Sequence, residues 1–372
     1  MVTKTIPPSA NALGRFGRTT GLTPRSLAIW VVITVVILVF PLIDANDSHV
    51  GGAADAGVFI LLALGLNIVV GYAGLLDLGY AAFFAIGAYT YAMTASPHFG
   101  LHLPFWPMLL AAAIIAAMFG ALLGFPTLRL RGDYIAIVTL GFGEIVPTII
   151  LNLDKITGGP DGIAAIDHPG LPGFTFGVSA RPYYYLILVI MAVLIWAITN
   201  LRDSRLGRAW MAVREDEIAA ACMGINTTVV KLLAYALGAS FSGFAGVLYV
   251  SKLGLASPDM FLFTVSVQIL SMVVLGGMGS VTGVIAGAFI LYELQTLVLT
   301  QMTIWSHSLG ATLHLQLLQQ WDFTNLKFLL YGVALVAMML FRPEGLIPST
   351  QRKAELKGEE ASEPAPVPTQ AA

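Results

Sequence analysis

Residues 56–95 read AGVFILLALGLNIVVGYAGLLDLGYAAFFAIGAYTYAMTA, with two uncharged apolar segments, 56–71 and 78–95, on either side of a glycine-rich break. At a rise of about 1.5 Å per residue, each segment would be ~24–27 Å long as a helix, close to the thickness of a bilayer core. We therefore predict two membrane-spanning helices joined by a sharp turn.

The same apolar pattern recurs along the whole chain. Apolar residues make up 57% of the sequence and charged residues only 11%, whereas soluble proteins contain about 25% charged residues. This composition excludes a soluble globular protein and predicts an all-α polytopic membrane protein with about ten transmembrane helices. The other eight predicted segments are 27–43, 107–125, 134–151, 183–200, 232–250, the short 264–277, 282–300 and 326–341.

Lysine and arginine predict the orientation, because loops rich in these residues stay in the cytoplasm. With ten spans and an N-terminus inside, fifteen of the 19 basic residues fall on the cytoplasmic side and four fall outside. We therefore expect both termini in the cytoplasm. The predicted organisation is a cytoplasmic segment 1–26, a transmembrane domain 27–347 and a disordered cytoplasmic tail 348–372. Within the domain we expect a cytoplasmic loop at 201–231 and an outer interfacial segment at 301–325.

Two glycine-rich breaks occupy corresponding places, one after residue 70 and one after residue 275, each between two apolar segments. In transporters, paired breaks of this kind mark inverted repeats around a central pathway. Close packing of helices through small residues is the alternative explanation. The predicted hinge glycines are Gly71, Gly74, Gly79, Gly276, Gly277 and Gly279.

The loop 201–231 contains residues 207–226, GRAWMAVREDEIAAACMGIN. This pattern predicts one helix over residues 208–223 with alanines on one face, and Gly224 is a typical helix stop where a larger side chain is expected to clash. A helix on such a loop has no lipid face to cover, so we expect it to press against another protein; a solvated connecting helix is the alternative. The predicted contact residues are Arg208, Arg214, Glu215, Asp216, Ala219, Ala220 and Gly224.

Seven segments of the chain together resemble a known family. They are residues 74–91 (GLLDLGYAAFFAIGAYTY), 128–134 (LRLRGDY), 139–144 (TLGFGE), 157–162 (TGGPDG), 207–226, 276–280 (GGMGS) and 342–346 (RPEGL). The chain resembles the longer, M-type permease subunit of bacterial high-affinity branched-chain amino acid ABC importers. The resemblance runs from about residue 56 to residue 347.

The resemblance implies a subunit of an ATP-driven importer in the bacterial inner (plasma) membrane, forming half of the pathway for leucine, isoleucine and valine. It implies that residues 207–226 form a coupling helix that docks on an ATPase. The implied partners are a homologous second permease, two ABC ATPases that bind ATP and Mg²⁺, and an extracytoplasmic amino-acid-binding protein. We expect no cofactor or metal on this chain and no nucleic-acid partner.

Other functions have less support in the sequence. The chain has no Gly-Lys pair, and therefore no phosphate-binding loop of the usual type, and no His-Glu-x-x-His motif. A membrane enzyme is therefore poorly supported. An ion-coupled secondary transporter would also have repeats and buried acids, and a permease for urea or short amides is a related alternative.

Polar residues inside the predicted spans are expected to face protein or water, because a charge at the bilayer centre costs about 2.5–3.5 kcal/mol on insertion scales. For Asp77 we expect a helix cap rather than a pathway role, whereas both roles stay open for Glu144. The candidate pathway residues are Asn67, Asp77, Thr139, Glu144, Gln268 and Ser271.

Overall fold

A computed structural model of the protein describes residues 35–44, 46–127, 133–171, 174–177, 179–313 and 323–348. The chain divides into two compact units, residues 1–46 and 47–372. In the first unit, residues 35–43 form a helix, which is the described part of the predicted first span. The predicted N-terminal segment 1–26, motif residues 128–132, residues 314–322 and the tail from residue 349 lie outside the described residues.

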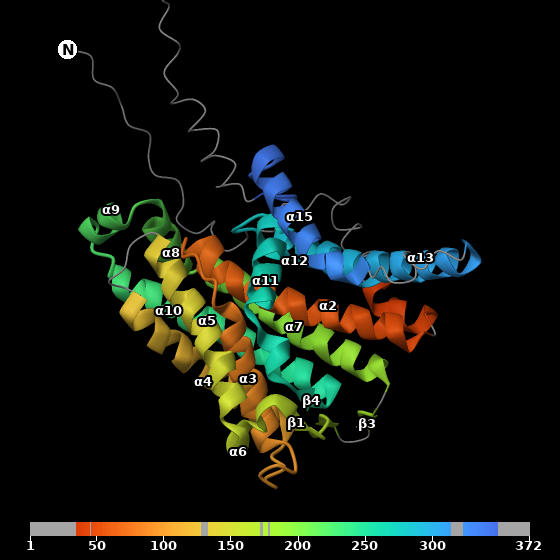
Figure 1. Ribbon diagram of the computed structural model, residues 1–372. Coiled ribbons are helices and arrows are strands. Elements are labelled where there is room, and N and C mark those ends of the chain that lie inside the picture. Colours follow the sequence, from red (N-terminus) through yellow and green to blue (C-terminus); the bar gives the residue numbers. More distant parts are fainter. Residues whose placement is uncertain are drawn as a thin grey trace, which may run out of the picture. The chain divides into compact units, whose positions relative to one another are not determined.

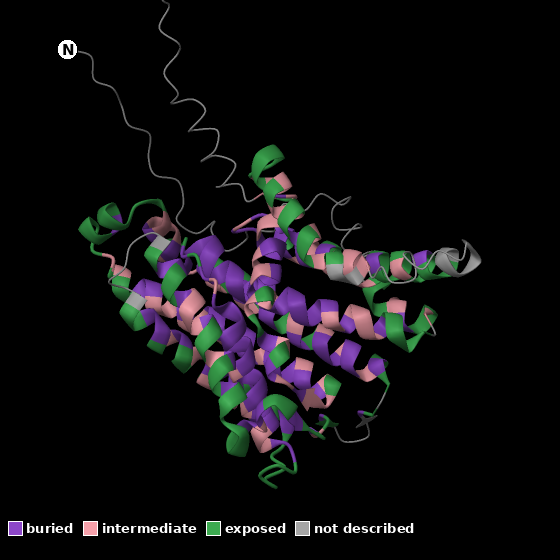
Figure 2. Ribbon diagram, viewed as in Figure 1, coloured by how far each residue is buried: buried purple, intermediate pink, exposed green. Residues whose placement is uncertain are grey.

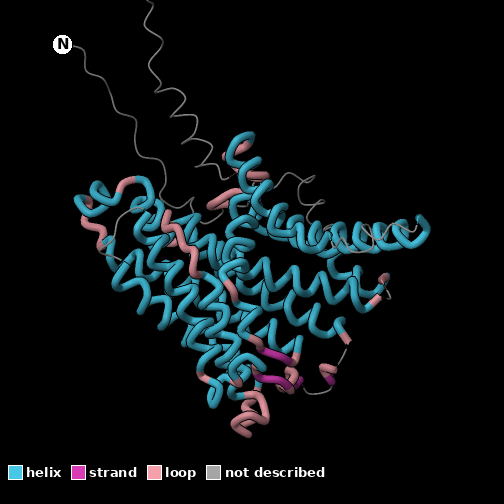
Figure 3. The backbone as a smooth tube through the Cα atoms, in the orientation of Figure 1, coloured by secondary structure: helices cyan, strands magenta, loops and turns pink. Residues whose placement is uncertain are grey.

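The second unit is built almost entirely from helices, with two short pairs of strands (Figures 1 and 3). The longer helices are α2 (Asp47–Leu66), α3 (Tyr80–Thr94), α4 (Phe105–Thr127), α5 (Asp133–Asn152), α7 (Ala180–Asp203), α8 (Arg205–Glu215), α10 (Thr227–Leu253), α11 (Phe263–Gly276), α12 (Val281–Glu293), α13 (Thr300–Leu313) and α15 (Lys327–Phe341). The short helical elements are η1 (Asn67–Tyr72), α6 (Asp154–Thr157), η2 (Gly159–Asp161), α9 (Glu217–Cys222), η3 (Pro258–Phe261), η4 (Leu294–Leu299) and η5 (Phe323–Leu326).

Among the described residues, seven helical stretches are long and apolar enough to cross a membrane. The all-α polytopic fold is therefore confirmed, and these stretches correspond to seven of the ten predicted spans within the described part of the chain. The predicted third and tenth spans form α3 and α15, which have only 15 residues each. The seven stretches are Asp47–Tyr72, Phe105–Pro126, Tyr134–Asn152, Ala180–Asp203, Thr227–Leu253, Pro258–Gly276 and Val281–Ser308.

Two predicted segments have different bounds in the structure. The short segment 264–277 is lengthened by the 3₁₀ turn η3, which brings the helical stretch to 19 residues. The predicted span 282–300 does not end at residue 300, because the π-helix η4 joins α12 directly to α13. Residues 301–313 of the predicted interfacial segment therefore prolong the preceding helix.

Helix α10 packs against α2, α3 and α4. Glycines allow this close approach: a β-carbon at Gly87 would lie 2.5 Å from the Cα of Gly243 on α10. Buried residues are concentrated along α2 and α3, as Figure 2 shows. Dispersion contacts and small-residue packing of this kind stabilise helix bundles in lipid, where the hydrophobic effect between helices is weak.

The unit has two distinct ends, which can be followed in Figure 1. One end, called here the α8–α9 end, carries those two helices and both glycine breaks. At the opposite end, β1 (Ile163–Ala164) pairs antiparallel with β4 (Leu255–Ala256), and the Lys252 ammonium lies 2.6 Å from the Asp55 carboxylate. A second antiparallel pair joins β2 (Gly170–Leu171) to β3 (Phe174–Thr175).

Candidate functional site

The loop between α7 and α10 forms two helices rather than the single helix predicted over residues 208–223. The backbone at Asp216 is extended (φ −153°, ψ 110°), which ends α8 and begins α9. The Asp216 carboxylate accepts hydrogen bonds from the amides of Ile218 (2.8 Å) and Ala219 (3.0 Å). The physical reason for the division is this cap, since an aspartate in extended conformation satisfies N–H groups at the start of a helix.

Trp210 and Lys231 hold the two helices against α10. Trp210 is fully buried, and its indole N–H donates to the carbonyl of Val230 over 2.7 Å. The ammonium of the buried Lys231 lies 2.6 Å from the carboxylate of Glu217 on α9. An aromatic anchor and an ion pair therefore connect the two helices to α10.

The outer surface of α9 is apolar and uncovered within the described structure. Ile218 is 69% exposed and Met223, directly after the helix, is 83% exposed. Of the two alanines predicted to make contacts, Ala219 is exposed and Ala220 is buried. The charged residues Arg208, Glu215 and Asp216 are also exposed. A rigidly held helix with large exposed apolar side chains is typical of a docking surface.

Gly224 follows the end of α9, as expected for a helix stop. A β-carbon at Gly224 would meet no atom of this chain within 4 Å, so the expected clash does not arise within the chain itself. The backbone there has φ +83°, in the left-handed region that glycine adopts without strain. The requirement for glycine is therefore conformational.

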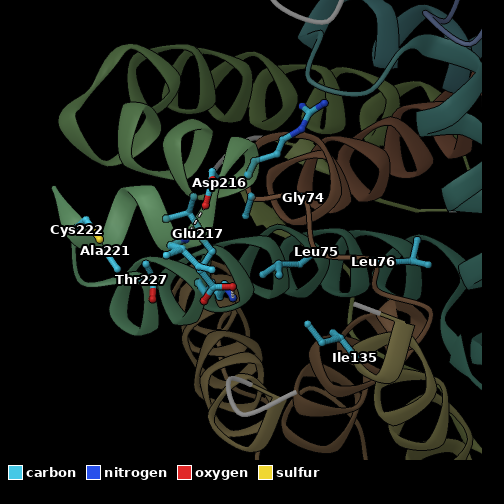
Figure 4. A pocket seen from close by; sticks show the side chains of 14 residues that line it. Gly74, Leu75, Leu76, Ile135, Asp216, Glu217, Ala221, Cys222 and Thr227 are labelled. Carbon is cyan, nitrogen blue, oxygen red and sulfur yellow. Dashed lines mark hydrogen bonds and ion pairs between the residues drawn. The ribbon is translucent and has the colours of Figure 1, made fainter. Parts of the chain in front are cut away.

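A groove of about 850 Å³ separates α9 from the loop that follows η1. In Figure 4, Cys222 and Glu217 lie on one side of this groove and Gly74, Leu75 and Ile135 on the other. Helix α9 therefore lies across this groove from the first of the two glycine breaks.

The first break, residues 71–79, is in direct contact with α8. The π-helix η1 ends here, and the Arg214 guanidinium on α8 donates a hydrogen bond to the carbonyl of Gly71. The stem of Arg214 also lies against Gly74, where a β-carbon would be 2.8 Å from the arginine Cγ. Gly74 has φ +70°, so glycine is required there for both space and conformation.

Side chains from three elements cap the start of α3 next to this break. The Asp77 carboxylate accepts from the amide of Gly79 at 2.9 Å, which is the arrangement of a cap. The Thr139 hydroxyl on α5 accepts from the amide of Leu78 at 3.1 Å, and the Ser266 hydroxyl on α11 accepts from the amide of Ala81 at 2.9 Å. These bonds satisfy amides that a broken helix leaves without partners.

The second break, residues 276–280, lies against the first. The Asn67 side-chain oxygen accepts a hydrogen bond from the amide of Gly279 over 2.8 Å. Gly277 (φ +111°) and Gly279 (φ +83°) have conformations that favour glycine. The Ser280 hydroxyl then caps α12 by accepting from the amide of Gly283 at 3.1 Å.

The six candidate pathway residues therefore do not converge on one cavity. Asn67, Asp77 and Thr139 are buried at the two breaks. Gln268 donates to the side-chain oxygen of Gln295 over 3.2 Å, and Ser271 donates to a carbonyl of its own helix. Only Glu144 is exposed, on α5.

Several functional contacts were missed by the sequence reasoning. Ser266 and Gln295 gave no signal, because a single serine or glutamine in an apolar run is common in membrane helices. Trp210 was detectable, since a tryptophan within a polar loop needs an apolar site to bury it. Lys231 was counted only as a positive charge.

The fold and the site together define a class of protein. A polytopic bundle with two helix breaks in mutual contact, and a firmly anchored helical loop at the same end, has the architecture of a transport permease.

Comparison with known proteins specifies the family. The chain belongs to the family described as "Branched-chain amino acid transport system / permease component", whose model matches residues 48–339. It is 39% identical to the high-affinity branched-chain amino acid transport system permease protein LivM of Salmonella typhimurium, over 92% of this chain and 79% of that protein. It is 40% identical to LivM of Escherichia coli, over 91% of this chain and 78% of that protein.

A more distant similarity links the chain to the permease protein LivH of the same type of system. The LivH protein of Salmonella typhimurium is 26% identical over 64% of this chain and 81% of that protein. No solved structure matches the chain.

Proposed function

We propose that this chain is the permease subunit of an ATP-driven importer and forms half of the pathway for leucine, isoleucine and valine. The observation that carries the proposal is the α8–α9 loop, held by Trp210 and Lys231 and exposing Ile218 and Met223. The similarity to LivM over 92% of the chain supports the substrate class.

The α9 surface is the proposed docking site for an ABC ATPase. The chain contains no phosphate-binding loop, so ATP and Mg²⁺ bind on separate subunits. Exposed apolar side chains flanked by charges suit a groove on a partner, with Ile218 and Met223 as the anchors. Two such ATPases and an extracytoplasmic amino-acid-binding protein complete the proposed assembly.

The exposed face of α5 is the proposed contact with the second permease. Ile137, Ile145 and Ile149 are at least 50% exposed, and Ile137 lies seven residues, about two helical turns, before the exposed Glu144. A carboxylate at this depth is costly in lipid, so it faces a partner or a wet pathway. The presence of a second permease type, LivH, among the relatives supports a heterodimer with the pathway between the subunits.

The finer topology also belongs to this proposal. The chain would cross a bacterial inner membrane ten times, with both termini inside. The predicted first span, described from residue 35, together with α3 and α15 would bring the seven long stretches to ten. The two breaks would be corresponding parts of inverted repeats. The direct contact between Asn67 and Gly279 supports this relation.

Uptake measurements in the native cell test the substrate class. Deleting the gene should abolish high-affinity uptake of labelled leucine and leave urea uptake unchanged, because the relatives are named for branched-chain amino acids. The matched control is the same deletion carrying a plasmid copy of the gene. Loss of urea uptake with normal leucine uptake would contradict the substrate and favour a permease for urea or short amides.

A further inference from the structure

Both helix breaks leave backbone carbonyls that need hydrogen-bond donors, because a helix end cannot satisfy its last carbonyls internally. At the first break the donor is the Arg214 guanidinium, which bonds to the carbonyl of Gly71. At the second break the donors are backbone amides from residues 342–347, called here the strap. Leu346 donates to Leu275 at 2.9 Å, and Ile347 donates to Gly276 at 3.2 Å.

The strap follows α15 and is fitted closely to the second break. Gly345 has φ +88°, and a β-carbon there would overlap the Cα of Gly277. A β-carbon at Gly277 would in turn lie 3.0 Å from the carbonyl of Glu344. Two glycines thus meet face to face, which leaves the strap and the break no room to slide past each other.

Asn67 joins the two breaks. Its buried side-chain oxygen accepts from the amide of Gly279 at 2.8 Å, across 212 positions of sequence. A β-carbon at Gly71 would lie 2.7 Å from the same amide nitrogen. The backbones of the two breaks are therefore in contact as well as hydrogen-bonded.

These contacts form a continuous series from the docking loop to the end of α15. We propose that Arg214, Asn67 and the strap act as one linkage, which carries a displacement of α8 and α9 to both glycine breaks together. Arg214 and Asn67 are positioning residues in this linkage, which rests on the proposed ATP-driven function.

The geometry of Arg214 suits transmission in both directions. Its hydrogen bond to Gly71 pulls the first break when α8 moves away, and its stem against Gly74 pushes the break when α8 approaches. Because Asn67 ties the second break to the first, the starts of α3 and α12 would tilt in step. The role of residues 342–346, a motif without an assigned role, is then to hold the second break to α15.

The test uses the complete transporter, with partner permease, ATPases and binding protein, reconstituted in liposomes. The measurement is the number of ATP molecules hydrolysed per leucine transported. Asn67→Ala should raise this ratio at least about fivefold, the size expected when a buried hydrogen bond worth ~1 kcal/mol is lost. A purely structural defect would lower the amount of active transporter and leave the ratio unchanged.

Matched variants separate the linkage from packing. Asn67→Asp keeps the acceptor oxygen. It loses no hydrogen bond of the amide nitrogen, because that nitrogen has no partner among the described residues. We therefore expect the ratio of ATP to leucine to be lower in Asn67→Asp than in Asn67→Ala. Leu346→Pro removes the amide that bonds to Leu275 and should raise the ratio, whereas Leu346→Ala keeps it. The side-chain amide of Asn200 donates to a carbonyl of its own helix, α7. Asn200→Ala should therefore have the same ratio of ATP to leucine as the wild type.

The two possible failures give different results. If the wild-type transporter shows no ATP-dependent leucine uptake, the proposed function is wrong. If wild-type uptake is normal and Asn67→Ala and Leu346→Pro both keep the wild-type ratio, the linkage is wrong. Should Asn67→Ala not assemble, the comparison of Leu346→Pro with Leu346→Ala decides alone.

Discussion

Gly224 sits in a left-handed conformation (φ +83°) with open space around its Cα. A left-handed conformation costs an ordinary residue roughly 1–2 kcal/mol, and asparagine tolerates it better than most. The free space and the backbone conformation therefore lead to opposite predictions for substitutions at this position. The space around residue 224 would accept a side chain of any size, whereas its left-handed backbone favours glycine and asparagine over branched residues.

We expect Gly224→Val to shift the end of α9 and to reduce ATP-dependent leucine uptake several-fold at equal expression. Gly224→Asn should retain most of the uptake, because its side chain accommodates the positive φ. The measurement is uptake by vesicles containing equal amounts of the assembled transporter. Equal uptake by both variants would show that the backbone conformation at residue 224 does not matter for coupling.

At the scale of the element, α9 is anchored on one side and exposed on the other. Glu217 pairs with the buried Lys231, while Ile218 is 69% exposed. Exposed apolar patches mark interaction sites, and Ile218 shares this surface with the exposed Met223. The exposed side of α9 is therefore the part of the loop that the proposed ATPase would cover.

We expect Ile218→Asp to reduce co-purification of the ATPases at least about fivefold, the change in binding that corresponds to the loss of an apolar anchor worth ~1 kcal/mol. Glu215→Lys, on the exposed end of α8, should weaken the same association by reversing charge. The measurement is the ATPase recovered per permease after affinity purification. The control is Thr228→Asp, exposed on the first turn of α10. Undiminished recovery with Ile218→Asp would place the docking surface elsewhere.

The elements themselves were largely predictable from sequence. Long apolar runs placed α2, α4, α5, α7 and α10, because the length of a membrane helix is set by the bilayer. The division of the loop at Asp216 was also readable, since aspartate is a preferred N-cap, but the alanine-rich pattern suggested a continuous helix. The continuation of α12 into α13 was not predictable, because the π-helix η4 that joins them has no clear sequence signature.

Contacts between elements that are distant in the chain could not be predicted from the sequence. Apolar periodicity places a residue on a face of its own helix and says nothing about which other helix lies opposite. The bond from Asn67 to Gly279 and the bond from Ala81 to Ser266 join residues 212 and 185 positions apart. Asn67 and Gly279 were both singled out, one as a pathway residue and one as a hinge, but their direct contact was not expected.

At the scale of the whole unit 47–372, the features described above lie at two opposite ends. The α8–α9 loop, both breaks and the strap share one end, while the β1–β4 pair and the Lys252–Asp55 ion pair lie at the other. The distribution of lysine and arginine predicts that the α8–α9 end faces the cytoplasm. This orientation is a requirement of the proposed function, because ATP is available on that side.

Cys222 offers a direct test of this orientation, since it is the single cysteine of the chain and is exposed. In intact cells it should react with a membrane-permeant maleimide and be unreactive toward an impermeant, charged one. The matched control is Lys155→Cys in a Cys222→Ser background, because Lys155 is exposed just after α5 at the opposite end. That cysteine should react with both reagents. Labelling of Cys222 by the impermeant reagent in sealed cells would invert the topology and remove α9 from the reach of any cytoplasmic ATPase.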